Sequence, residues 1–178
     1  MSDQLTLVAT VEEIEEYVAA DGWDQGARLY ALVPTAELLD REPQLAAALG
    51  LDPAATEEGL TPIEQDTGHA PALLEELLAT IVWPAEVVGC VAAVERVVLP
   101  PEADADLPED PAEAAAYAAG HPLRQEVRLV AGVTRTGASY CALRMRAHDQ
   151  AQSVVAGPDL VPGLIELLRT TLEEEHPL

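Results

Sequence analysis

The hydrophobic and polar positions of the chain repeat with two different periods. Apolar residues spaced three and four apart, with acidic residues between them, predict amphipathic helices over 3–20, 72–83 and 157–174. Continuous or alternating apolar runs predict strands over 27–33, 86–99, 125–135 and 139–147. Short helices are expected from Thr35, after Pro43 and over 112–119, and loops over 51–70 and 100–112.

The last two predicted strands form a β-hairpin, and the apolar face of the hairpin fixes its register. A two-residue turn at 136–137 would place Leu129 opposite Arg144 and mix apolar and charged side chains. A three-residue loop over 136–138 pairs Leu129 with Met145 and keeps one face apolar. We therefore expect the three-residue loop.

This register also defines the other face of the hairpin, which the pattern predicts to be exposed. It holds the pairs Arg128 with Arg146, Val130 with Arg144, and Glu126 with His148. Two arginines opposite each other repel, so this face needs negative charge from elsewhere.

The order of elements is helix, strand, helices, strand, helix, hairpin and helix. It predicts an α+β fold: a mainly antiparallel four-stranded sheet with helices packed on one face and at the ends. The length of 178 residues suits a single domain spanning 1–178. Asp159 is the expected cap of the last helix, and Pro162 suits its first turn.

The charge of the chain narrows the possible partners. Nine arginines and no lysine stand against 32 acidic residues, which gives a net charge of −23. Such a field repels nucleic acids and anionic membranes, so we expect neither as a partner. No apolar run is long enough for a membrane span. Glutamates occupy the place of a signal peptide's apolar stretch, which favours the cytoplasm.

The absence of lysine excludes several kinds of chemistry. P-loop nucleotide binding, pyridoxal phosphate catalysis and protein kinase activity all require a lysine. The two cysteines, Cys90 and Cys141, lie in apolar segments and indicate buried thiols rather than a disulfide framework. No zinc-binding spacing of histidines or cysteines is present, so we expect no metal, no cofactor and no catalytic residues.

Two groups of residues are candidate sites. Arg128, Arg144, Arg146 and His148 lie in a net-positive segment of an acidic chain. They predict either an anion site, where arginines clamp a phosphate or carboxylate, or a set of internal ion pairs.

The second candidate is Trp23-Asp24-Gln25, in the connector after the first helix. It is either a surface recognition loop or a tryptophan folded over the junction between helix and strand.

Five segments carry a resemblance to a known family. They are GWDQGARLYALVPTAELL, VWPAEVVGCVAAVERVVLPPE, HPLRQEVRLVAGV, CALRMRAHD and GPDLVPGLIELL. With these the chain resembles an actinobacterial family of uncharacterised proteins. The resemblance implies a single cytoplasmic domain and carries no activity, substrate or catalytic residue.

The sequence is compatible with two functions. The first is a non-enzymatic domain that binds a protein partner, or a second copy of itself as a homodimer. The second is a protein or enzyme that binds a small anion through Arg128, Arg144, Arg146 and His148. The two differ in what the arginines contact.

Overall fold

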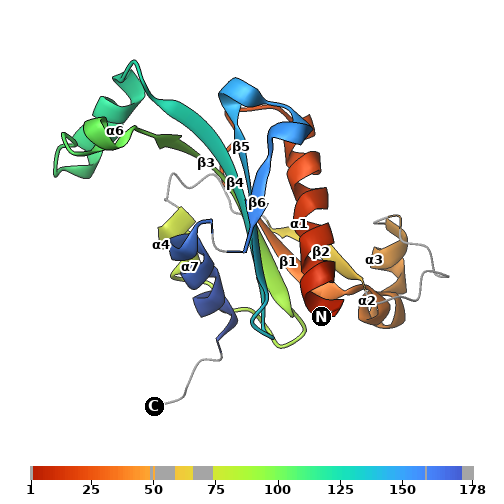
Figure 1. Cartoon of the computed structure of the whole chain (residues 1–178). Coiled ribbons are helices and arrows are strands. Elements are labelled where there is room, and N and C mark those ends of the chain that lie inside the picture. Colours follow the sequence, from red (N-terminus) through yellow and green to blue (C-terminus); the bar gives the residue numbers. More distant parts are fainter. Residues whose placement is uncertain (1, 49, 51–58, 66–73, 159, 174–178) are drawn as a thin grey trace, which may run out of the picture.

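The protein is built on one antiparallel sheet of six strands. A computed structural model describes residues 2–48, 50, 59–65, 74–158 and 160–173. The strand order across the sheet is β2-β1-β3-β4-β5-β6 (Figure 1). The strands are β1 Arg28–Pro34, β2 Leu60–Gln65, β3 Gly89–Val98, β4 Gln125–Thr134, β5 Ser139–Met145 and β6 Val155–Gly157.

The prediction of a four-stranded sheet was wrong, because it missed both edge strands, β2 and β6. β2 lies in the stretch expected to be a loop, and Pro62 in its middle argues against a strand. Proline is tolerated there because β2 is an edge strand, paired only with β1 among the described strands. β6 has three residues, which is too short to show an alternating pattern.

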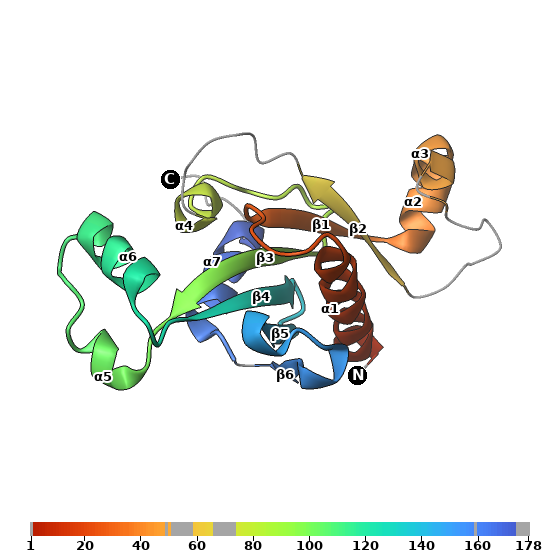
Figure 2. The same cartoon turned by 90° about the horizontal axis from the view of Figure 1, so that it is seen from above.

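Helices cover both faces of the sheet, which also corrects the expectation of helices on one face. α1 packs on one face, and α4 and α7 pack on the other (Figures 1 and 2). The helices are α1 Ser2–Ala20, α2 Thr35–Arg41, α3 Pro43–Ala48, α4 Leu74–Leu78, α5 Pro101–Asp104, α6 Pro111–Gly120 and α7 Pro162–Leu172. The physical reason is visible in β3, whose residues 89–94 are all buried and therefore need cover on both sides.

Two helices are shorter than the periodicity predicted. α4 ends at Leu78. α7 begins at Pro162, which occupies its first turn as expected. The predicted cap, Asp159, lies outside the described residues, and Val161 holds the capping position. In the described part of the chain, no helix has both the length and the apolar character needed to cross a membrane.

A glycine on β4 lets α1 lie close to the sheet. A Cβ atom at Gly132 would stand 2.9 Å from a methyl group of Val11 and 3.0 Å from one of Val91. Only glycine therefore fits at this crossing without a shift of its neighbours. The close approach buries Leu7 and Val11 completely.

The hairpin has the predicted three-residue loop, but one residue earlier, at 135–137. Thr134 and Ala138 close it with a backbone hydrogen bond of 3.0 Å. Gly137 has a φ of 98°, which requires a glycine at the last loop position and sets the register. As a result Leu129 pairs with Leu143 rather than Met145.

The hairpin loop is fastened to its surroundings by Arg135. Its guanidinium donates hydrogen bonds to carbonyl oxygens of Val87 at 2.7 Å, Pro84 at 3.0 Å and Trp83 at 3.2 Å. It also donates to the carbonyl oxygen of Leu172, near the end of α7. This residue therefore joins the hairpin to α7 and to the connection before β3.

The far ends of β3 and β4 project beyond the helix layers and carry α5 and α6 (Figures 1 and 2). We call residues 97–125 the arm. α5 lies in the stretch that was expected to be a loop. Asp110 caps α6 by accepting a hydrogen bond from the backbone N–H of Glu113 at 3.1 Å.

Candidate functional site

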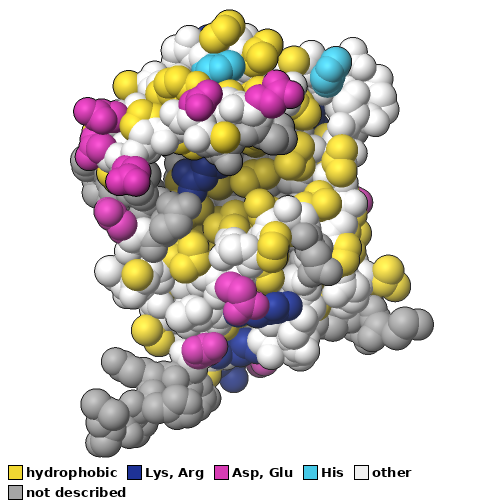
Figure 3. All heavy atoms as spheres, turned by 60° about the vertical axis from the view of Figure 1, so that its left-hand side comes forward, with side chains coloured by type: hydrophobic (Ala, Val, Ile, Leu, Met, Phe, Trp, Pro, Cys, Tyr) yellow, Lys and Arg dark blue, Asp and Glu magenta, His cyan; other side chains and the backbone are white. Residues whose placement is uncertain are grey.

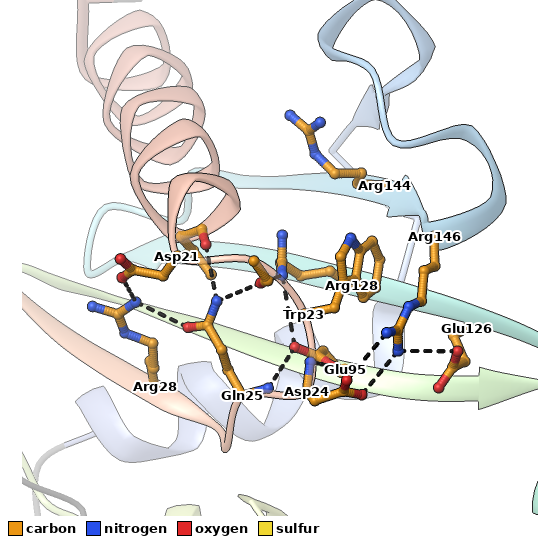
Figure 4. Close-up of polar contacts among 12 residues, drawn as sticks. Asp21, Trp23, Asp24, Gln25, Arg28, Glu95, Glu126, Arg128, Arg144 and Arg146 are labelled. Carbon is orange, nitrogen blue, oxygen red and sulfur yellow. Dashed lines mark hydrogen bonds and ion pairs between the residues drawn. The ribbon is translucent and has the colours of Figure 1, made fainter.

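The structure brings the two predicted groups of residues together. The turn after α1, residues 21–26, folds over the ends of β3, β4 and β5 (Figure 4). We call the resulting assembly the arginine cluster. It consists of Glu15, Trp23, Asp24, Gln25, Glu95, Glu126, Arg128, Arg144, Arg146 and Asp149.

The arginine face of the hairpin is buried, not exposed as its pattern predicted. The side chains of Arg128 and Arg144 are 1% and 7% exposed, because α1 and the turn after it cover this face. The observed register places Arg128 directly opposite Arg144 rather than opposite Arg146. The strand ends at Met145, so Arg146 and His148 belong to a short 3₁₀ helix and not to the hairpin.

Arg144 is paired with two carboxylates of its own chain. It donates hydrogen bonds of 2.8 and 2.7 Å to the two carboxylate oxygens of Glu15 on α1, and one of 2.9 Å to Asp149. These hydrogen bonds, above all those to Glu15, raise the pKa of Arg144. The geometry is the two-pronged contact that makes arginine–carboxylate pairs strong, so Arg144 ties α1 to β5.

Arg128 is held by an aromatic ring and by single polar contacts. Its guanidinium carbon lies 4.4 Å from the ring centre of Trp23, within the range of a cation–π contact. One terminal nitrogen lies 3.6 Å from Glu95 and donates to the carbonyl oxygen of Gly22. The other two guanidinium nitrogens have no hydrogen-bond partner among the described residues. The buried charge of Arg128 is thus stabilised by Trp23, Glu95 and the carbonyl group of Gly22.

Glu95 also fixes the turn itself. Its two carboxylate oxygens accept backbone N–H groups of Asp24 and Gln25, each at 2.9 Å. The side-chain amide of Gln25 donates a hydrogen bond of 3.0 Å to the carbonyl oxygen of Val18, near the end of α1. The turn is therefore held between α1 and β3.

Arg146 closes the cluster on the solvent side. It donates to both carboxylate oxygens of Asp24, at 2.8 and 3.1 Å, and to Glu126 at 3.2 Å (Figure 4). The hydrogen bond from Arg146 lowers the pKa of Asp24. His148 is exposed and takes part in none of these ion pairs in the described structure.

Trp23 links the turn to the segment after β5. Its indole N–H donates a 2.9 Å hydrogen bond to Asp149, which Arg144 also contacts. The hydrogen bond from Trp23, followed by that from Arg144, lowers the pKa of Asp149. Arg144 and Arg146 already donate hydrogen bonds to carboxylates of the same chain, and an incoming anion would have to displace those carboxylates.

A second feature, which the sequence analysis missed, is an apolar hollow between α7 and the sheet. It has a volume of about 420 Å³. We call it the α7 hollow; it is lined by Arg96, Leu129, Leu160, Val161, Pro162, Gly163, Leu164 and Leu167. Hydrophobic side chains gather on this face of the molecule, below the arm (Figure 3).

The arm beside the α7 hollow is acidic. Figure 3 shows acidic side chains on the same face as the gathered hydrophobic ones. Exposed carboxylates on the arm come from Glu102, Asp106, Glu109, Asp110 and Glu113. The sequence showed this run of acids, but not that the fold places it near an apolar surface.

A smaller pocket of about 190 Å³ lies beside β6, on the α1 face. It is lined by Glu12, Glu15, Glu16, Ala142, Val154 and Ala156. Of its three glutamates, Glu15 is paired with Arg144, while Glu12 and Glu16 are exposed.

The cysteines do not form a reactive centre. Cys90 and Cys141 are both buried and neither forms a disulfide, as the sequence predicted. Burial raises the pKa of the Cys90 thiol to about 11, which keeps it protonated at neutral pH. Within the described ranges, no three His, Cys, Asp or Glu side chains are grouped to hold a metal ion.

Comparison with known proteins places the chain in a family without assigning an activity. No curated protein and no solved structure matches it. The family model described as PPA1309-like protein matches residues 7–173. The match spans the sheet with both of its helix layers, so the chain belongs to the PPA1309-like protein family.

Proposed function

We propose that this protein is a non-enzymatic domain that binds another protein, and that the α7 hollow is its docking surface. The observation that carries the proposal is an apolar hollow of about 420 Å³ beside an arm with exposed carboxylates. The occupant we propose is a segment of another protein with apolar side chains flanked by Lys or Arg.

The apolar part of the proposal rests on the lining of the hollow. Leu160 is 39% exposed, and Leu167 is only partly buried against the core. Apolar surface gathered in a concavity is typical of protein or ligand contacts, whereas single exposed apolar residues are not. Burying a leucine-sized side chain there stabilises a complex by about 1.5–3 kcal/mol.

The charge of the chain favours a cationic partner. The net charge of −23 attracts a basic segment and speeds its association. Two copies of this chain would instead repel each other, so the homodimer is the less favoured form of the proposal.

The anion-binding alternative stays a prediction. It requires a phosphate or carboxylate to replace Glu15, Asp24 or Asp149 on Arg144 and Arg146. Since those carboxylates are tethered to the same chain, a free anion competes at a disadvantage, and we favour protein binding.

A titration with synthetic peptides tests the docking surface. The probe is a short amphipathic peptide of leucine and lysine carrying a fluorophore, followed by fluorescence anisotropy. Leu160→Asp adds negative charge to the hollow while removing an apolar contact. Electrostatic attraction alone would keep or strengthen binding, whereas apolar docking predicts a loss of about tenfold.

The matched control is Leu45→Asp. Leu45 is 41% exposed on α3 and is not part of the α7 hollow, so this variant adds the same charge at similar exposure. We expect it to bind the peptide as the unchanged protein does. Equal binding by all three proteins would contradict docking in the hollow.

We also propose that the protein works in the cytoplasm of an actinobacterium. The two buried cysteines, which form no disulfide, support a reducing compartment, and the resemblance of the sequence supports the source. Fractionation of the host cells with an antibody against the protein checks the location.

A further inference from the structure

The two edges of the sheet differ in their capacity to accept another strand. β2 carries Pro62, which lacks a backbone N–H and so interrupts an added ladder. β6 at the opposite edge contains no proline and no charged residue. On its outer side no strand of the described chain pairs with it. β6 is therefore the open edge.

The register of the sheet shows what a strand added to β6 would meet on the α7 side. Val94, Leu129, Leu143 and Val155 lie opposite one another in a row across β3, β4, β5 and β6. Val155 at the end of this row is 53% exposed. Leu129 in the same row lines the α7 hollow. A strand beside β6 would extend this row with its own apolar side chain.

The next row lies on the α1 face and has a different character. Ala142 on β5 pairs with Ala156 on β6, and both line the pocket of about 190 Å³. Glu12 and Glu16 of α1 also line this pocket, and their side chains are exposed. A residue of an added strand opposite Ala156 would direct its side chain to this side, where a Lys or Arg finds opposite charge.

We propose that the partner segment binds in extended form as a seventh strand on β6, with an apolar–cationic–apolar pattern. The apolar residues face the α7 side and continue toward the hollow, and the cationic residue faces Glu12 and Glu16. This inference rests on the proposed protein-binding function and names the partner's conformation and sequence pattern. Backbone hydrogen bonds supply affinity and the alternating side chains supply specificity.

The test uses a set of peptides built from valine and arginine. The first peptide alternates the two residues, and the second has the same composition in blocks. Two further peptides alternate but carry N-methyl groups either on the valines or on the arginines. In a strand, N–H groups of alternate residues point to the same side, so only one methylated series faces β6.

We expect the alternating peptide to bind at least tenfold more tightly than the block peptide. One N-methylated series loses binding and the other keeps it. Amide hydrogen exchange at Val155–Gly157 slows when the alternating peptide is present. Glu16→Gln weakens its binding several-fold, whereas the control Glu13→Gln, on the same helix but outside the pocket, has no effect.

Three outcomes would overturn the seventh strand. They are equal binding of the alternating and block peptides, no effect of either methylated series, and a stable dimer of the protein alone that protects the amides of β6. The proposed function is judged separately, since Leu160→Asp reports on the hollow whatever conformation the peptide adopts.

Discussion

The ring centre of Trp23 lies 4.4 Å from the guanidinium carbon of Arg128 and 5.7 Å from that of Arg146. The indole thus contacts two cations, and its N–H binds Asp149. The turn after α1 therefore covers a buried arginine. The interaction couples the turn after α1 to β4 and to the segment that follows β5.

Replacement of Trp23 tests this coupling. Trp23→Leu removes the cation–π contact and the hydrogen bond, and we expect a loss of about 2 kcal/mol in the free energy of unfolding. Trp23→Phe keeps a ring over Arg128 and should lose less, about 1 kcal/mol. Urea denaturation followed by circular dichroism measures both. Equal losses in the two variants would show that the stacked ring contributes nothing.

The buried and exposed arginines should differ sharply in their effect on stability. Arg144→Ala leaves Glu15 buried without its partner, and we expect a loss of about 3 kcal/mol or more. Arg146→Ala removes an exposed pair with Asp24, so we expect its loss of stability to be much smaller than that of Arg144→Ala. Both are measured by urea denaturation at neutral pH.

A double variant separates the value of the pair from the cost of breaking it. Arg144→Met combined with Glu15→Leu removes both charges, so its loss should be smaller than that of either single variant. A loss equal to the sum of the single variants would indicate that Arg144 and Glu15 act independently.

The crossing of α1 over Gly132 predicts a steric effect. Gly132→Ala places a methyl group within 3.0 Å of Val11 and should cost about 1–3 kcal/mol. Gly120→Ala is the control, because the same atom at the end of α6 meets nothing within 4 Å. We expect the control to be neutral or slightly stabilising by less than about 1 kcal/mol. Thermal unfolding compares the two.

Asp149 should contribute to the acid sensitivity of the fold. Its pKa in the folded protein lies below the ordinary value of 3.8, so its stabilisation is present at neutral pH. That stabilisation is lost as the pH falls from about 3.8 through the lower pKa that Asp149 has in the folded protein. The stability difference between the unchanged protein and Asp149→Asn should therefore be constant near neutrality and shrink below about pH 4. Urea titrations at several pH values measure it, and a constant difference at all pH values would contradict the assignment.

The buried thiols predict low chemical reactivity. With both cysteines buried and the pKa of Cys90 near 11, Ellman's reagent should label neither in the folded protein. In denaturant it should label both. Rapid labelling of the native protein would show that the core around Cys90 opens readily.

The sequence predicted the central strands and the long helices because their apolar periods are strong. It did not predict the edges of the sheet: Pro62 disguises β2, and β6 is too short to have a period. The loop of the hairpin had the right length, but the left-handed conformation of Gly137 decides where it sits. Local patterns therefore determined the elements, and backbone geometry determined their exact pairing.

The candidate site shows a different limit of sequence reasoning. Arg128, Arg144 and Trp23 were all singled out, but as two separate sites, and the two arginines were predicted to lie on an exposed face. A pattern of alternating side chains shows which residues share a face of a strand, but not which element covers that face. The partner of Arg144 is Glu15, 129 positions away along the chain. The α7 hollow depends on the spacing of a helix and a sheet, which no local pattern encodes.

The hydrogen bonds of Arg135 to four carbonyl oxygens have a consequence for how the protein tolerates salt. The guanidinium of Arg135 is bound by neutral carbonyl groups, whereas Arg146 is bound by exposed carboxylates. Added salt screens exposed ion pairs far more than hydrogen bonds to neutral groups. The hairpin loop should therefore keep its hydrogen bonds in concentrated salt under which the contacts of Arg146 loosen, so ionic strength would weaken the solvent side of the arginine cluster without loosening the hairpin loop.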